Sequence, residues 1–159
     1  INYHFQSKEG LLFKVLEHGH LHLNQQIQAI DLDKLKDLPD FVSRVFHILF
    51  ENREMIKNIM RIILSPECSK LKEYGLSEAV GQAPGTETLL RFIREHLKLK
   101  LNPNDELWLI QNVFALIFHS VKMMSSPFAK LTKAKHLSDI KLIEKNLRRS
   151  SEAFVNYLS

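Results

Sequence analysis

Apolar residues recur along this chain at intervals of three and four positions, the spacing that places them on one face of a helix. The first such run follows Ser7, a favourable N-cap residue, and ends at a charged connector over residues 31–37. Its apolar positions are Leu12, Leu16, Leu23, Ile27 and Ile30. This pattern predicts one long N-terminal helix with a single buried face.

The same spacing predicts further helices over about 39–50, 55–64, 86–97, 104–124 and 138–158. Pro39, Pro66 and Pro103 lie near the ends of these segments, where a proline can begin a helix or stop one. The composition agrees, because the 159 residues include only five glycines and five prolines. The expected fold is therefore all-α, a single bundle of six or seven helices that ends in two long helices.

The segment over 104–124 is the most apolar part of the chain. Gln111, Asn112 and His119 interrupt it, so it falls short of the roughly 18 clean apolar residues of a membrane-spanning helix. We therefore expect a buried helix here and no membrane among the partners of the protein.

Charge and cysteine content exclude few classes of function. There are 22 lysines and arginines against 18 aspartates and glutamates, and a net charge of +4 does not identify a nucleic-acid surface. Cys68 is the single cysteine, so no internal disulfide can form. A lone thiol suits a reducing compartment, and we expect a cytoplasmic protein in which Cys68 simply packs.

The first twelve residues carry the most specific motif. They contain Tyr3-His4-Phe5, then Ser7-Lys8-Glu9, then Leu11-Leu12. This order closely resembles the end of the recognition helix and the start of the fourth helix in tetracycline-repressor (TetR) family transcription regulators. On residue types alone, the segment could equally be an ordinary helix N-terminus.

The resemblance implies a division of the chain and a function. Residues 1–6 would be the remnant of a DNA-binding helix-turn-helix, and residues 7–159 the ligand-binding and dimerisation domain. Tyr3, His4 and Lys8 would contact the DNA backbone, because a helix N-terminus with a lysine and nearby hydroxyl or imidazole groups suits a phosphate. The expected function is an effector-responsive regulator, most often a repressor in this family, that binds operator DNA through a head preceding Ile1.

An effector pocket is expected among large and deformable side chains on converging helices, with a few polar groups to orient a small apolar ligand. The candidates are Phe41, Phe46, Met60, Phe92, Trp108, Gln111, Asn112, Phe114, Phe118 and His119. Each apolar member could instead be ordinary core, because most buried apolar residues simply pack.

A homodimer is expected through the last two long helices, which in this family pair with their symmetry mates in a four-helix arrangement. The candidate interface residues on the final helix are Ile140, Ile143, Leu147, Ser150, Ser151, Phe154 and Leu158. The alternative is that this helix closes the core of its own chain.

Other chemistry has little support in the sequence. His18 and His22 have the i, i+4 spacing of metal ligands, but no third ligand lies at a matching helical step, so neither they nor His20 are predicted to bind a metal. No nucleophile elbow, glycine-rich phosphate loop or HExxH pair occurs, so no catalytic residue and no cofactor is predicted. The alternative function is a helical protein-interaction module without a small-molecule effector.

Overall fold

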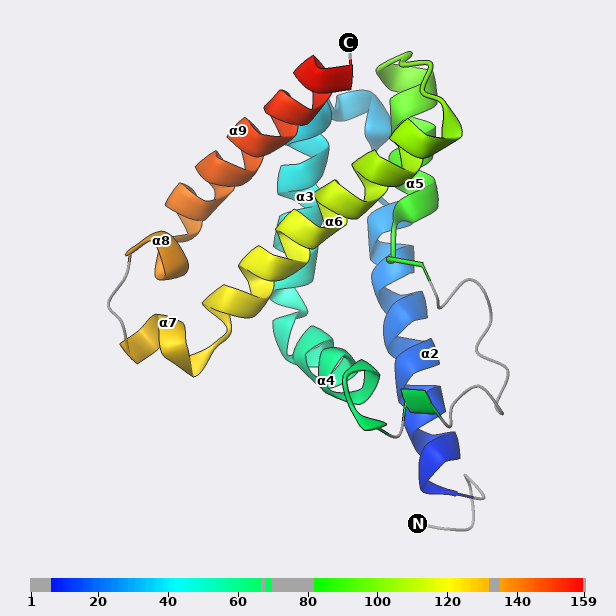
Figure 1. Ribbon diagram of the computed structural model, residues 1–159, viewed down its shortest axis with the longest axis vertical. Coiled ribbons are helices and arrows are strands. Elements are labelled where there is room, and N and C mark those ends of the chain that lie inside the picture. Colours follow the sequence, from blue (N-terminus) through cyan, green and yellow to red (C-terminus); the bar gives the residue numbers. More distant parts are fainter. Residues whose placement is uncertain (1–6, 67, 70–81, 132–134, 159) are drawn as a thin grey trace.

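The structure is a computed structural model that describes residues 7–66, 68–69, 82–131 and 135–158. Over these residues the chain is a helical bundle, and no strand occurs among them (Figure 1). The all-α fold expected from the sequence is confirmed.

The N-terminal helix α2 (Lys8–Gln28) begins where the sequence predicts. The Ser7 hydroxyl accepts a hydrogen bond from the Gly10 amide at 3.0 Å, and Glu9 lies in the first turn, at the positive end of the helix dipole. The buried face of α2 contributes to two apolar clusters. Phe13 and Leu16 pack with Ile62, whereas Leu23 and Ile27 belong to the main core.

Helix α3 (Leu38–Glu51) is the centre of the bundle and follows the short turn η1 (Leu32–Lys34). Asp37 caps it by accepting from the Asp40 amide at 2.8 Å. The apolar side chains of this helix that the rest of the bundle buries completely include Phe41, Val42, Val45, Phe46 and Leu49, and Phe50 at its end is half-buried. Helix α4 (Arg53–Ile63) follows after a break at Asn52 and packs against α2.

Helix α5 (Thr86–Arg91) continues directly into a single π turn, η3 (Phe92–His96). The Leu97 amide donates to the Phe92 carbonyl at 3.1 Å, five residues back, and Lys98 then adopts the left-handed region at φ 53°. The spacing of the apolar residues predicts an ordinary helix up to Leu97, because this spacing does not distinguish a widened last turn from a regular one.

The C-terminal third contains two long helices, of 22 and 19 residues. Helix α6 (Pro103–Met124) starts at Asn102, whose side chain accepts from the Asn104 and Asp105 amides, and α9 (Ile140–Leu158) ends the described chain. The one-turn helices α7 (Pro127–Leu131) and α8 (Lys135–Ser138), which the sequence pattern does not predict, connect them. Helix α9 packs mainly against α3 and also against α6.

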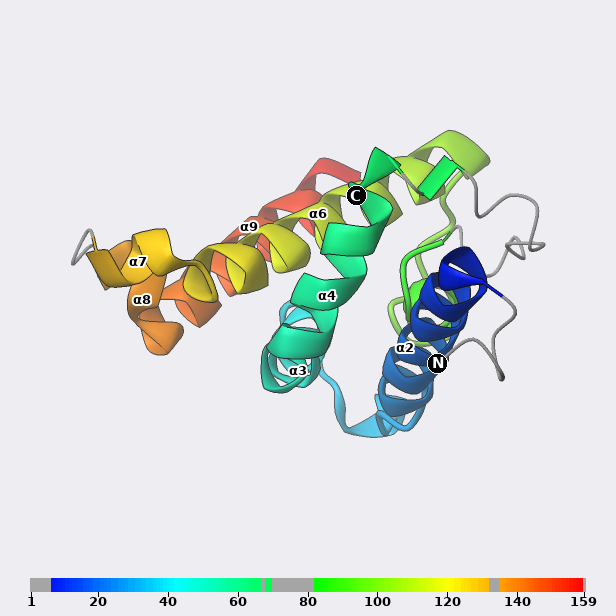
Figure 2. The ribbon, with the colours of Figure 1, turned by 90° about the horizontal axis from the view of Figure 1, so that it is seen from below.

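Two views show how these helices are arranged. Helices α6 and α9 form one side of the molecule, with α3 and α4 behind them and α2 farther away (Figures 1 and 2). The length and composition of α6 would allow it to cross a membrane, a test that core helices also meet, and 28% of its most apolar window is buried by this chain. Much of α6 is therefore not covered by its own bundle.

Candidate functional site

An apolar cavity of about 360 Å³ lies where α2, α4 and α6 meet the residues that precede α5. Its walls are Leu16, His20, Leu23, Ile56, Ile59, Met60, Ile63, Cys68, Gln82, Ala83, Pro84 and Phe118. Cavities of this size and apolar character are typical of sites for small organic molecules.

The cavity exists because two amphipathic helices present deformable apolar side chains to the same space. Leu16 and Leu23 lie two turns apart on the buried face of α2, and α4 faces them with isoleucine and methionine side chains. Gly19 lets the helices approach, since a Cβ atom there would lie 2.6 Å from Ile59 Cδ1. The two helices are close at Gly19 and leave the cavity beside that contact.

Two hydrogen bonds tie α2 to the residues before α5, and the first of them is made by two residues of the cavity wall. His20 Nε2 donates to the Gln82 carbonyl oxygen at 3.1 Å, and Asn24 Oδ1 accepts from the Gly85 amide at 2.9 Å. Gly85 has φ 88°, and a Cβ atom at this position would lie 2.7 Å from Ile27 Cγ2. One wall of the cavity is thus fixed to α2 by two hydrogen bonds and a close backbone approach.

The structure places two of the predicted pocket residues, Met60 and Phe118, in the wall of this cavity. Four other predicted pocket residues lie elsewhere. Phe41, Phe46, Phe92 and Phe114 are buried in the main core and line no part of this cavity, which corrects the prediction for them. The stacking of Phe41 on Phe92, with ring centroids 5.4 Å apart, fills the space that a ligand would need.

The predicted pocket residues of α6 are also elsewhere. Trp108 packs edge-on against Phe154 at 5.5 Å between ring centroids, and the Asn112 side chain donates to the Trp108 carbonyl at 2.7 Å. Gln111 and His119 are exposed on the outer face of α6. The pocket prediction is therefore corrected for these four residues of α6. Helical spacing shows which residues share a face but does not show which neighbour covers that face.

Most of the cavity wall was missed by the sequence argument. Leu16, Leu23, Ile56 and Ile59 were recognisable as buried stripes, but nothing in a single stripe marks which part of it borders a void. The contribution of Gln82, Ala83 and Pro84 depends on the close contact at Gly85, which is a long-range feature.

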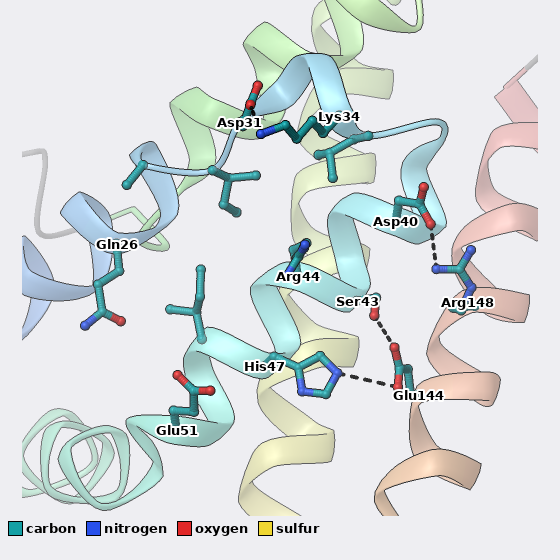
Figure 3. A pocket seen from close by; sticks show the side chains of 14 residues that line it. Gln26, Asp31, Lys34, Asp40, Ser43, Arg44, His47, Glu51, Glu144 and Arg148 are labelled. Carbon is teal, nitrogen blue, oxygen red and sulfur yellow. Dashed lines mark hydrogen bonds and ion pairs between the residues drawn. The ribbon is translucent and has the colours of Figure 1, made fainter.

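A second concavity, of about 720 Å³, is polar and lies between the end of α2, η1, α3 and α9 (Figure 3). Arg148 Nη1 donates to Asp40 Oδ1 at 2.8 Å, and the Ser43 hydroxyl donates to Glu144 Oε1. His47 Nε2 lies 3.5 Å from Glu144 Oε2. These contacts join α3 to α9 along one wall of the groove.

The charges in this groove change the acidity of its carboxyl groups. The hydrogen bond from Arg148 holds the pKa of Asp40 below its ordinary value of 3.8. The hydrogen bond from Ser43, together with the nearby His47, lowers the pKa of Glu144. Both carboxylates are therefore ionised at neutral pH and already engaged, and along this wall the groove links two helices.

The predicted dimer residues on α9 divide into two sets. Ile143, Leu147 and Ser151 are buried by their own chain, with Ser151 fully inaccessible, because α9 packs this face onto α3. For these three the interface assignment is corrected, and they belong to the core of the single chain. Ile140, Ser150, Phe154 and Leu158 are half-buried at its edge.

The proposed DNA contacts are described only in part. Tyr3 and His4 lie outside the described residues, and Lys8 is exposed in the first turn of α2.

Farther along this helix, His18 and His22 stack with ring centroids 6.4 Å apart, and Gln26 Nε2 donates to His22 Nε2 at 2.9 Å. Within residues 7–66, 68–69, 82–131 and 135–158, no three His, Cys, Asp or Glu side chains are grouped so as to hold a metal ion.

Comparisons with known proteins give no further identification of this bundle. No protein-family model, no curated protein and no solved structure matches the chain.

Proposed function

We propose that this chain is the effector-binding and dimerisation part of a DNA-binding transcription regulator. The observation that carries the proposal is that the apolar cavity has α2 as one of its walls. The same helix begins with Ser7-Lys8-Glu9, the motif that in TetR-family regulators opens the helix joining the DNA-binding head to the rest. A ligand in this cavity would contact the helix that leads to DNA.

The geometry supports a specific mechanism for such a regulator. Gly19 and Ile59 set the shortest approach between α2 and α4, and the cavity lies beside that contact. A ligand that fills the cavity favours conformations in which α2 and α4 are farther apart. The ligand shifts the population only if it binds the conformation with separated helices more tightly than the conformation that the protein adopts without ligand.

The cavity wall also defines the chemistry of the effector. Its lining is almost entirely aliphatic, thioether and aromatic, with His20 and Gln82 as the polar residues of the wall. A compact apolar molecule, aromatic or branched aliphatic, with at most one hydrogen-bonding group, would fit this surface.

The proposed dimer uses the outer face of α6. Leu107, Gln111, Ala115 and His119 follow one another at intervals of four residues, and all four are exposed. None of these four residues is a lysine, arginine, aspartate or glutamate, and the charged residue of this face is Lys122, exposed one turn beyond His119. The small Ala115 would allow a second helix to approach closely. A face with one charged residue, on an apolar helix that its own chain leaves largely uncovered, suits a two-fold contact with a second copy.

Titration calorimetry and thermal shift with small aromatics such as indole and naphthol test the cavity. Binding is expected to raise the melting temperature, and Met60→Trp, which fills the cavity, should abolish it. Leu21→Trp, at an exposed position of α2 outside the cavity wall, is the matched control and should leave binding unchanged. Equal binding by the Met60→Trp variant would contradict the assignment of the site.

The DNA-binding half of the proposal has a separate test, the sequence of the gene upstream of the codon for Ile1. A helix-turn-helix segment in frame there is the expected result. A start codon just before Ile1, or an unrelated domain, would remove the regulator proposal and leave a helical ligand-binding or protein-interaction module.

A further inference from the structure

The positive charge of this protein is concentrated in one short part of the chain. Residues 127–149 contain seven of the 22 lysines and arginines but only two of the 18 aspartates and glutamates. That stretch therefore carries a net charge of +5, and the remainder of the chain carries −1. The modest net charge of the whole protein conceals a strongly basic region.

This region forms one end of the molecule. Helices α7 and α8 lie beside the C-terminal end of α6 and the start of α9, and both views place them at the outer edge of the bundle (Figures 1 and 2). On α9, Lys141, Lys145 and Arg149 follow at intervals of four residues and are all exposed. They form a basic row that leads away from this end.

Exposed apolar side chains accompany the basic residues. Helix α7 buries Ala129 at 2% exposure, whereas Phe128 is 56% and Leu131 80% exposed. Leu142, in the first turn of α9, is 36% exposed beside Lys141. A large apolar residue in water is unremarkable when single, but here three of them share one end of the bundle with a cluster of positive charge.

We propose that this end, built from α7 and the first half of α9, docks on an anionic lipid surface. Phenylalanine and leucine side chains enter the boundary between headgroups and acyl chains, while lysines and arginines remain among the phosphates. The proposal goes beyond the proposed regulator function and requires no spanning helix. It departs from the expectation of no membrane among the partners, an expectation based on the absence of a clean membrane-spanning segment.

Two other partners fit the same surface less well. A nucleic acid would attract the lysines and arginines, but it offers no apolar phase for Leu131, the most exposed of the apolar residues. A second copy of this chain, docked end to end by the same surface, would bring two regions of net charge +5 into contact. An anionic bilayer satisfies the charged and the apolar side chains together.

Co-sedimentation with vesicles tests the proposal, using three parts phosphatidylcholine to one part phosphatidylglycerol and, for comparison, phosphatidylcholine alone. Binding is expected to the anionic vesicles only and to weaken as salt rises, because screening shortens the range of the lysine charges. Lys141→Glu combined with Lys145→Glu should lower the partition constant at least tenfold, since each basic residue near such a surface contributes roughly fivefold. Phe128→Ser combined with Leu131→Ser should lower it by a similar factor.

Matched controls keep the result specific. Lys98→Glu with Lys100→Glu makes the same charge change on exposed residues before α6, and Leu21→Ser removes an exposed leucine from α2. Both should bind as the unaltered protein does, and circular dichroism confirms that every variant is folded.

Three outcomes would overturn the proposal. The first is no binding to anionic vesicles at low salt. The second is binding that is indifferent to the Phe128 and Leu131 changes while a short DNA duplex competes through the same lysines, which would assign the surface to nucleic acid. The third is a dimer mass that the Phe128 and Leu131 changes alone reduce to the monomer, which would assign it to a second copy.

Discussion

Gly85 shows at the residue scale how one backbone position connects two distant parts of the chain. Its positive φ and the contact with Ile27 leave no room for a side chain, and its amide is held by Asn24. Neither the close contact with Ile27 nor the hydrogen bond to Asn24 can be predicted from apolar spacing. The sequence shows a glycine-rich loop here but not its contact with α2.

Gly85→Ala should therefore lower the free energy of unfolding by about 1–3 kcal/mol, from left-handed strain and overpacking against Ile27 together. Urea denaturation measures the change. Gly19→Ala is the informative companion, because the backbone at Gly19 is helical and the atom that a Cβ would meet most closely is Cδ1, at the end of the Ile59 side chain. It should cost clearly less, and an equal or larger loss would contradict the role given to Gly85.

The Arg148–Asp40 pair predicts how stability depends on pH. The pKa of Asp40 is lower in the folded protein than its ordinary value of 3.8, so the pair stabilises the fold above that pH. The stabilisation is lost as pH falls through 3.8 and then through the lower folded pKa. Because both side chains are partly exposed, the contribution is small, about 0.5–1 kcal/mol.

Asp40→Asn should thus destabilise the protein at pH 7 and converge with the unaltered protein in strong acid. Denaturation followed at a series of pH values checks this. Asp139→Asn, a change of the same charge at an exposed residue that caps the start of α9, should not reproduce a dependence on Arg148. If Arg148→Met removed no pH dependence, the pair would not be its source.

At the scale of elements, the sequence predicted the long helices well and their partners poorly. The stripes that defined α2, α3, α6 and α9 begin and end within a few residues of the observed bounds. The stripe of α9 was nevertheless assigned to a second copy, although α3 of the same chain covers it. Apolar residues at helical spacing predict that one face of a helix is buried, but they do not show which part of the protein, or which partner, covers that face.

Leu147→Ala tests which partner covers α9. Since Leu147 is 1% exposed and packs within the main core, its truncation should cost about 2–5 kcal/mol, even in a monomer. Leu142→Ala on the same helix removes the same atoms from an exposed position and should cost well below half of that. A loss that appears only at concentrations where the protein dimerises would return Leu147 to an interface between chains.

At the scale of the whole molecule, the bundle has two sides of different character. One side encloses the apolar cavity between α2 and α4, and the other presents the outer face of α6. The all-α fold followed from composition and spacing, whereas the cavity and the outer face depend on how the helices pack in three dimensions.

Sedimentation or light scattering at micromolar concentration tests the proposed dimer, for which the expected mass is twice the chain mass of 18.6 kDa. Ala115→Arg, placed at the centre of the outer face of α6, should give a folded monomer, because a bulky charge prevents close helix contact. Asn58→Arg, on the exposed side of α4, should remain dimeric. A monomeric unaltered protein would end the dimer proposal, and a dimeric Ala115→Arg variant would place the interface elsewhere.

The division of α2 between two apolar clusters has a consequence for local unfolding. Among the described residues, its first half buries Phe13 and Leu16 in the small cluster with Ile62, whereas its second half is part of the main core at Leu23 and Ile27. Helix ends that bury few apolar groups open without the rest of the protein. Amide hydrogens early in α2 should therefore exchange with solvent much faster than those near Ile27, and an apolar molecule that bridges Leu16 and Leu23 would slow the exchange of the first half selectively.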